Sequence, residues 1–126
     1  MKKILLTLVL FLSMILLLTS CSFFGISCEQ AEKNLKDAGY NVTVMDGSAY
    51  VDSDDCLFPM LSGAELEYYL YAEKGEDKIC MFFFYFTEQA ERNYDFMHMN
   101  DRSLRSGMNN GTVYFGTKQA VKDSNI

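Results

Sequence analysis

The sequence predicts an α+β domain, in which a small antiparallel sheet carries two helices packed on one face. Apolar and polar residues alternate in segments 40–44 and 66–73, and segment 79–86 is apolar throughout; both patterns are typical of β-strands. Apolar residues recur instead every three or four positions in segments 28–38 and 87–97, which is the spacing of a helix with one buried face. Turn residues separate these segments, so helices and strands are expected in mixed order.

The first predicted helix begins after Ser27 and ends at Gly39. Ser27 can cap the helix and Gln30 completes a capping box, while glycine is typical of a helix end. One face of this helix carries Cys28, Ala31, Leu35 and Ala38. The strand that follows ends at the turn signal Asp46-Gly47, and its inward residues are Tyr40, Val42 and Val44.

Segments 66–73 and 79–86 predict a β-hairpin joined by a turn over residues 74–78. The second strand is apolar on both faces, so we expect it in the centre of the sheet. An alternative for residues 62–73 is a helix capped by Ser62, with Glu65 in an S-x-x-E box. Segment 48–61, which contains the only proline, predicts no regular element.

Three further elements complete the predicted fold. Thr87 caps a second helix, with Ala90, Tyr94 and Met97 on its buried face. Asn110-Gly111 marks a tight turn before a strand over 112–115, and Thr117 caps a short C-terminal helix. The resulting order, α-β-β-β-α-β-α, resembles a ferredoxin-like α+β sandwich that lacks its first strand. This likeness concerns the fold and implies no function.

The N-terminal segment differs in character from the rest of the chain. Lys2-Lys3 precede an apolar run over 4–18, and Leu18-Thr19-Ser20-Cys21 follows. This arrangement resembles the signal peptide and lipobox of bacterial lipoprotein precursors. The resemblance implies that residues 1–20 are a signal peptide and that Cys21, diacylated on its sulfur, becomes the first residue. It also implies a lipid anchor on the extracytoplasmic face of the cell membrane, a tether over 21–27 and one globular domain over 28–126.

A transmembrane anchor is the alternative to a cleaved signal peptide. No charged residue lies between Ile4 and Cys28, so residues as far as Ile26 can lengthen the apolar run into a tilted span. The run over 4–18 alone, at about 1.5 Å per residue, is shorter than a hydrocarbon core of about 30 Å. Either arrangement leaves the domain on the outer face, because positive residues stay on the cytoplasmic side.

The charge balance excludes one class of partner. The chain of 126 residues carries 11 Lys and Arg against 17 Asp and Glu, a net charge of −6, and removal of residues 1–20 takes away two lysines and no acid. Nucleic acid is therefore not an expected partner, because phosphate binding needs clustered Lys and Arg. Basic peptides, cationic ligands and metal ions remain plausible partners.

The first candidate site lies on the predicted hairpin. Glu67, Tyr69, Tyr71 and Glu73 would share one face of the sheet. If the helices cover the opposite face, the two tyrosines form an exposed strip edged with acid, a composition that suits protein or peptide recognition. The alternative is that a second layer buries them.

The second candidate site is an acidic loop. Asp52, Asp54 and Asp55 offer oxygen ligands of the kind that calcium prefers, but the segment lacks the EF-hand pattern. Met97-His98-Met99 offers ligands suited to copper(I), although neighbouring residues on a helix diverge by about 100° and cannot bind one ion together. A solvated loop and a core Met97 are the simpler interpretations.

No pattern in the chain indicates catalysis. His98 is the only histidine, and no nucleotide-binding loop or nucleophile elbow is present. Cys28, Cys56 and Cys80 leave three possible single disulfides open. We therefore expect no enzymatic activity and no cofactor. The hypothesis that the sequence favours is a lipid-anchored module that binds a protein or peptide, and the alternative is a binder of a small ligand or of a calcium-type cation.

Overall fold

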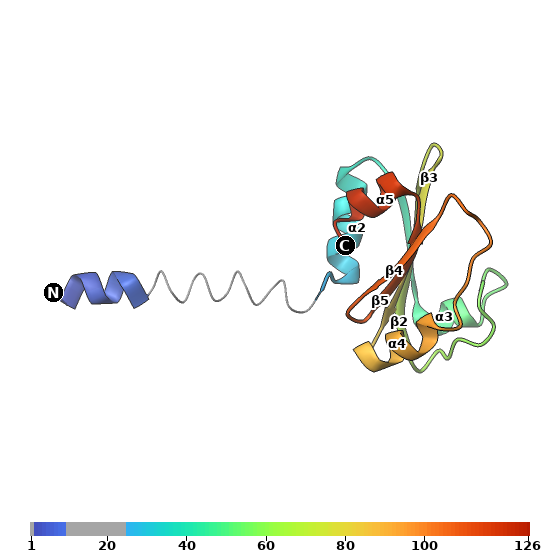
Figure 1. Cartoon of the computed structure of the whole chain (residues 1–126), viewed down its shortest axis with the longest axis horizontal. Coiled ribbons are helices and arrows are strands. Elements are labelled where there is room, and N and C mark those ends of the chain that lie inside the picture. The colour runs from blue at the N-terminus through green and yellow to red at the C-terminus, as the bar shows by residue number, and fades with distance from the viewer. Residues whose placement is uncertain (1, 10–24) are drawn as a thin grey trace.

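The computed structural model describes residues 2–9 and 25–126. Residues 25–126 form an α+β domain built on a five-stranded antiparallel sheet with the strand order β1-β2-β3-β5-β4 (Figure 1). In chain order the elements are α2 (Cys28–Asp37), β1 (Asn41–Asp46), α3 (Gly47–Val51), β2 (Leu66–Lys74), β3 (Asp77–Phe84), α4 (Thr87–Tyr94), β4 (Arg105–Asn109), β5 (Thr112–Gly116) and α5 (Lys118–Ser124).

The structure describes only part of the N-terminal segment for which predictions were made. Residues 2–9 are helical, and Leu18 to Cys21, the predicted lipobox, lie outside the described residues. Within residues 2–9 and 25–126, every helix is too short or too polar to cross a bilayer.

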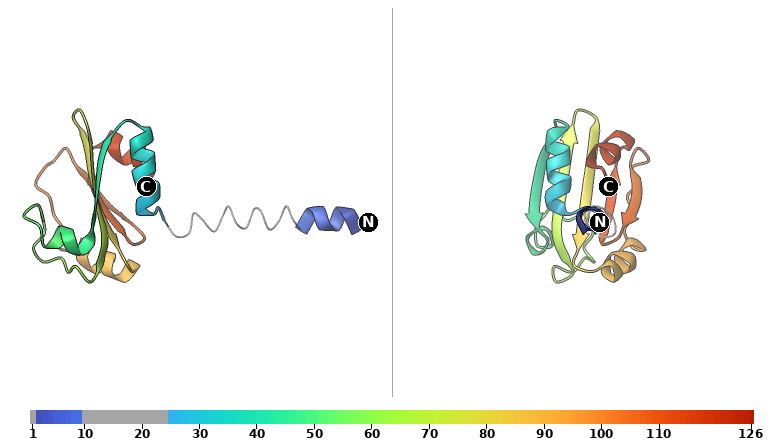
Figure 2. Two further views of the ribbon diagram at one scale, coloured as in Figure 1. Left: turned by 180° about the vertical axis from the view of Figure 1, so that it is seen from behind. Right: turned by 90° about the vertical axis from the view of Figure 1, so that its left-hand side faces the viewer.

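Two helices cover one face of the sheet, which we call the helical face. α2 contacts β1 and β2, while α5 contacts β3 and β5, and Figure 2 shows both helices in front of the strands. Ser27 caps α2 as predicted, because its hydroxyl accepts a hydrogen bond from the Gln30 N–H at 3.1 Å. The apolar core between these helices and the sheet includes Ala31, Leu35, Leu70, Ala72, Ile79, Met81, Phe83 and Ala120.

Loops, α3 and α4 cover the opposite face, which we call the loop face. Aromatic rings dominate its core: the rings of Tyr50 and Tyr69 stack with centroids 3.8 Å apart, and Phe82 packs edge-on against Tyr50. Segment 52–65 folds back over the sheet and adds Phe58, whose ring meets Phe82 at 5.5 Å. The segment after α4 adds Met97 to the same core.

The β2–β3 hairpin is confirmed, and residues 66–74 are strand rather than helix. Apolar residues of β3 are buried from Ile79 to Phe84 on both faces of the sheet, as expected for a central strand that pairs with β2 and β5. One irregularity was not expected: a β-bulge between Leu66 and Tyr68. A bulge inserts an extra residue, so the alternation of side chains shifts at that point.

The ferredoxin-like order is not confirmed. All four strand pairings are antiparallel, as the predicted antiparallel sheet requires, but the order of the elements differs from the predicted one. The chain also contains two elements that were not predicted, α3 and β4. The two helices on the shared face are α2 and α5; α4 adds Ala90 to the loop-face core instead. α4 also ends at Tyr94, three residues before the predicted end.

Candidate functional site

The predicted exposed strip on the hairpin is not formed. Tyr69 is only 8% exposed and stacks on Tyr50. Tyr71 is half-buried against the loop-face core, and its hydroxyl donates a hydrogen bond to the Glu73 carboxylate at 3.1 Å. The physical reason is that segment 48–61 folds back as a second layer, and burial raises the pKa of Tyr69 well above its ordinary value. These tyrosines therefore belong to the core.

Glu67 lies on the other face from Tyr69. Tyr68 pairs with Phe83, a residue of the helical-face core, whereas Tyr69 pairs with Phe82 on the loop face. Cross-strand partners point to the same side of a sheet, and the bulge at Glu67 adds one residue before this pair. As a result Glu67 borders a cavity on the helical face, next to Cys28. The four residues predicted to act together do not share one surface.

The acidic loop does not gather into a cation site. Asp52, Asp54 and Asp55 are all exposed, and among residues 2–9 and 25–126 no group of three or more His, Cys, Asp or Glu side chains is placed to hold a metal ion. Met97 lies in the core as the simpler interpretation required, and His98 is exposed.

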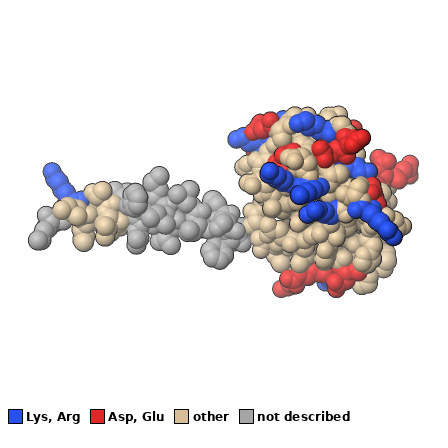
Figure 3. All heavy atoms as spheres, turned by 45° about the horizontal axis from the view of Figure 1, so that its top comes forward, with Lys and Arg blue, Asp and Glu red and all other residues tan. Residues whose placement is uncertain are grey.

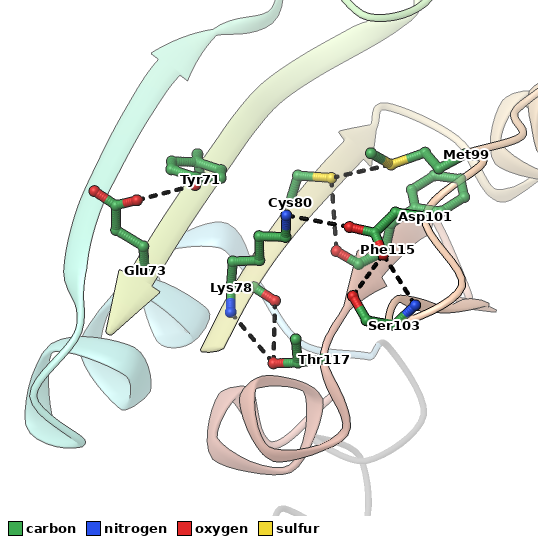
Figure 4. A network of polar contacts seen from close by, with 9 residues as sticks. All are labelled: Tyr71, Glu73, Lys78, Cys80, Met99, Asp101, Ser103, Phe115 and Thr117. Atoms are coloured by element: carbon green, nitrogen blue, oxygen red, sulfur yellow. Dashed lines mark hydrogen bonds and ion pairs between the residues drawn. The ribbon is translucent and has the colours of Figure 1, made fainter. Parts of the chain in front are cut away.

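The three cysteines of the described chain are free thiols. The sheet separates Cys28, on the helical face, from Cys80, on the loop face. Figure 4 shows the surroundings of Cys80: its sulfur lies 4.0 Å from that of Met99 and donates to the Phe115 carbonyl at 3.6 Å. Burial raises the pKa of the Cys80 thiol to about 12, so the thiol stays protonated and a weak nucleophile near neutral pH.

The polar contacts around Cys80 hold the loop before β4 to the sheet. Lys78 forms an ion pair with Asp101 at 3.2 Å, and the Ser103 hydroxyl donates to the same carboxylate at 2.6 Å. These hydrogen bonds, the Ser103 contacts foremost, lower the pKa of Asp101. Thr117 accepts from the Lys78 N–H and donates to Asp77 (Figure 4 shows the first contact). This network is structural, since it closes one end of the core.

A large cavity lies on the helical face at the lower end of the sheet. By the lower end we mean the end at the bottom of Figure 1, where β1 and β3 finish and β2 and β5 begin. This main cavity has a volume of about 560 Å³. The N-terminus of α2, the ends of the three inner strands and the β4–β5 turn surround it: Ile26 to Glu29, Glu32, Val44, Glu67, Tyr68, Phe83 to Tyr85, Thr87 and Asn110 to Thr112.

The cavity exists because the two covering helices stop short of the lower end. α2 begins only at Cys28, after its Ser27 cap, and α5 contacts the sheet near Ile79 and Gly116, at the upper end. Figure 2 shows α2 and α5 over the upper part of this face and α4 at its lower margin. The strands nevertheless continue downward and carry aromatic residues with them.

Three of these aromatic residues are exposed. Tyr68 is 37% exposed, Tyr85 54% and Phe86 67%. Tyr85 and Phe86 continue the apolar run of β3 past the edge of the core, and the Tyr85 N–H donates to the Glu65 carbonyl at 3.1 Å. The sequence run 79–86 contained this signal, because it continues past Phe84, where β3 ends. Phe86 follows the loop-face residues Phe82 and Phe84 in the alternation of the strand and does not border the cavity. We call Tyr68 and Tyr85, which both border the main cavity, the aromatic patch.

Basic residues are unevenly distributed along the strand direction. No Lys or Arg occurs between Asp37 and Glu73, and Arg92 is the only one between Ile79 and Asp101. The lower ends of β1, β2 and β3, together with α3, the loop after it and α4, come from these two stretches. Figure 3 shows Lys and Arg side chains mixed with Asp and Glu over the upper half of the domain, and mainly Asp and Glu along its lower margin. The lower end is therefore strongly acidic.

Three carboxylates border the main cavity. Glu32 forms an ion pair with Lys36 at 2.6 Å, whereas neither Glu29 nor Glu67 makes an ion pair with a residue of the described chain. Burial, and then the charges of Glu32 and Glu67, raise the pKa of the Cys28 thiol to about 12. Glu29 and Glu67 thus bring negative charge to the wall of the cavity that no ion pair of the described chain neutralises.

A second depression lies at the same end on the loop face. This apolar groove has a volume of about 300 Å³ and runs between segment 58–61 and the residues after α4. Met60 and Phe96 at its rim are exposed. Glu65 forms an ion pair with Arg92 at its edge and so ties the start of β2 to α4.

Comparisons with known proteins give no lead on these surfaces: no family model, no curated protein and no solved structure matches the chain.

Proposed function

We propose that the protein is a small lipid-anchored module on the extracytoplasmic face of the cell membrane, where it binds a protein or peptide partner through the lower end of its domain. The observation that carries the binding role is the aromatic patch beside the main cavity. Aromatic side chains gain much from burial and are enriched at protein interfaces. Their clustered exposure marks interaction sites on small domains.

The chemistry of the described residues supports binding rather than catalysis. The thiols of Cys28 and Cys80 have pKa values raised to about 12, chiefly by burial, and His98 lies apart on the surface. Such groups do not form the nucleophile and base pair that covalent catalysis requires.

The anchor rests on the N-terminal sequence. Only a short tether over 21–27 separates the lipobox cysteine, Cys21, from the first helix of the domain. Even a fully extended chain spans at most about 3.6 Å per residue, so this tether is short. Two acyl chains hold a protein stably in a bilayer where one does not. The domain would consequently work close to the membrane, and Ile26 and Ser27, at the end of the tether, border the main cavity.

A photo-crosslinking experiment in intact cells tests the binding role. In one variant a photoreactive amino acid replaces Tyr85, and in a control variant it replaces Lys36. Lys36 is exposed and lies near the C-terminal end of α2, away from the lower end. We expect one discrete adduct from position 85 and none from position 36. The same adducts from both positions, or none from position 85, would contradict the proposal.

Metabolic labelling tests the anchor. Cells that express the wild-type chain, Cys21→Ala or Cys56→Ala are grown with an alkyne fatty acid, and the purified chains are examined for label. We expect label on the wild type and on Cys56→Ala and none on Cys21→Ala, because only the lipobox cysteine carries the acyl chains. A wild-type chain without label would show that the protein is not a lipoprotein.

A further inference from the structure

The main cavity has the chemistry of a receptor for basic residues. We infer that the partner presents a segment in which basic residues alternate with aromatic or aliphatic ones. A Lys or Arg side chain of this segment enters the main cavity between Glu29, Glu67 and the aromatic patch. This inference rests on the proposed function and specifies the partner that it requires.

The first argument is charge complementarity. Glu67 stands in the wall of the cavity and Glu29 at its edge, and neither has a basic partner in the described chain. Glu67 and both tyrosines of the aromatic patch come from stretches in which Arg92 is the only base, and Arg92 is already paired with Glu65. An incoming cation therefore meets carboxylates that are free to pair with it, and the surrounding acids steer it toward this end.

The second argument is the mixed lining of the cavity. Tyr68, Phe83 and Tyr85 form aromatic walls beside the carboxylates. Long basic side chains have an apolar stem and a charged head, and the head can also lie over the face of a tyrosine or phenylalanine ring. A metal ion gains little from aromatic walls, and the carboxylates would repel an anionic ligand. The lining thus fits a Lys or Arg side chain better than an inorganic cation.

The third argument is the exposure of the aromatic patch. Tyr68 is 37% exposed and Tyr85 54%, although both border the cavity. An apolar neighbour of the basic residue would cover the exposed parts of these rings and exclude water from the ion pair, which strengthens it. For this reason we infer a segment that combines basic with apolar residues and not a simple polycation.

Binding of synthetic peptides to the full-length protein in non-ionic detergent tests the inference. The probe is a fluorescent 12-residue peptide of alternating Arg and Phe, compared with Arg/Ser and Glu/Phe peptides of equal length. We expect the Arg/Phe peptide to bind at least about tenfold more tightly than either of the others, since it alone matches both features of the site. Equal binding of the Arg/Ser peptide would overturn the apolar part, and equal binding of the Glu/Phe peptide the charged part.

Matched variants locate the bound peptide. Glu29→Gln/Glu67→Gln removes two charges at the cavity, and Glu73→Gln/Glu76→Gln removes two at the β2–β3 hairpin, at the upper end of the sheet. We expect the first pair to weaken binding at least about tenfold and the second by less than about twofold. Equal losses would mean that net charge alone attracts the peptide and would overturn the inference.

The chain's own Phe23 and Phe24 are the competing occupants, because they precede the cavity-lining Ile26 in the sequence. If Phe23→Ser/Phe24→Ser raises peptide affinity at least about tenfold, the cavity is filled by the tether and the inference fails. Unchanged affinity supports it. In the cellular experiment, an adduct from position 85 on a segment without basic residues would overturn this inference and leave the proposed module intact.

Discussion

Tyr69 and Tyr85 show how two tyrosines of one hairpin come to have different roles. Tyr69 lies under segment 48–61 and stacks on Tyr50, whereas Tyr85 stands beyond the covering layers. Different layers decide this difference: segment 48–61 covers Tyr69 on the loop face, whereas the helices of the other face leave Tyr85 more than half exposed beside the main cavity. At the residue scale, burial separates a structural aromatic from one that is available to a partner.

We predict that Tyr69→Ala destabilises the protein by about 3–5 kcal/mol, the usual cost of deleting a buried ring. Tyr85→Ala should cost less than about 1 kcal/mol, because its side chain is more than half exposed. Urea denaturation followed by tyrosine fluorescence measures both values. Similar losses from the two variants would contradict the assignment of Tyr69 to the core and Tyr85 to the surface.

At the scale of elements, the junction between α3 and β2 depends on a close backbone contact. Gly47 begins α3, and a Cβ at this position would lie 1.8 Å from the Leu66 carbonyl oxygen. Because the obstacle is backbone, it cannot rotate away as a side chain can. This contact places α3 beside the start of β2 and hence fixes the layer that covers Tyr69.

We predict that Gly47→Ala costs at least about 2 kcal/mol of unfolding free energy, since the strand or the helix must shift. Gly75→Asn is the matched control: Gly75 has φ +61 with no neighbouring atom within 4 Å, and Asn tolerates the left-handed region. It should change stability by less than about 1 kcal/mol. If Gly47→Ala proved as mild as the control in urea denaturation, the contact would not be rigid.

Elements with a strong local pattern could be predicted, and those without one could not. The β2–β3 hairpin has two long apolar strands around a polar turn, and α2 has a cap, a buried face and a glycine stop. By contrast, α3 has only five residues, and β4 is exposed at four of its five positions. Neither segment therefore shows the regular spacing of apolar residues that identifies a helix or a strand. The bulge at Glu67 depends on cross-strand pairing, which local alternation does not encode.

The candidate site was harder to predict than the fold for a related reason. The main cavity forms where α2 starts and α5 does not reach, and its walls come from five separate parts of the chain. The sequence shows the acidic and aromatic residues, but the prediction that Tyr69 and Tyr71 form an exposed strip assumed that no second layer covers their face of the sheet. A site that depends on which layers are missing needs the tertiary structure.

At the scale of the whole molecule, both layers bury groups that ionise only at high pH. Burial raises the pKa of Cys28 on the helical face and of Cys80 and Tyr50 on the loop face to about 12, from ordinary values of 9.0 for the thiols and 10.0 for the phenol. Below about pH 9 these groups are protonated in both the folded and unfolded chain. Above it, the unfolded chain releases their protons first, so unfolding becomes favoured.

We therefore predict that these groups leave the unfolding free energy unchanged between pH 6 and 8 and reduce it from about pH 9 to 12. Each group that ionises only in the unfolded chain steepens the fall by about 1.4 kcal/mol per pH unit. Urea titrations under reducing conditions at a series of pH values measure the slope, which should be shallower in Cys28→Ala. A stability that stays constant to pH 11 would disagree with the burial of these groups.

The packing of α2 against α5 also has a consequence for the time course of folding. The Asn34 side chain donates to the Ser124 carbonyl at 3.0 Å, across 90 residues of chain, and Tyr40 donates to Asp123 at 2.8 Å. A chain that emerges N-terminus first thus makes α2 long before its helical neighbour exists. Contacts so distant in sequence form late. The helical-face core closes only when the final residues are available, and until then the chain remains accessible to chaperones and proteases.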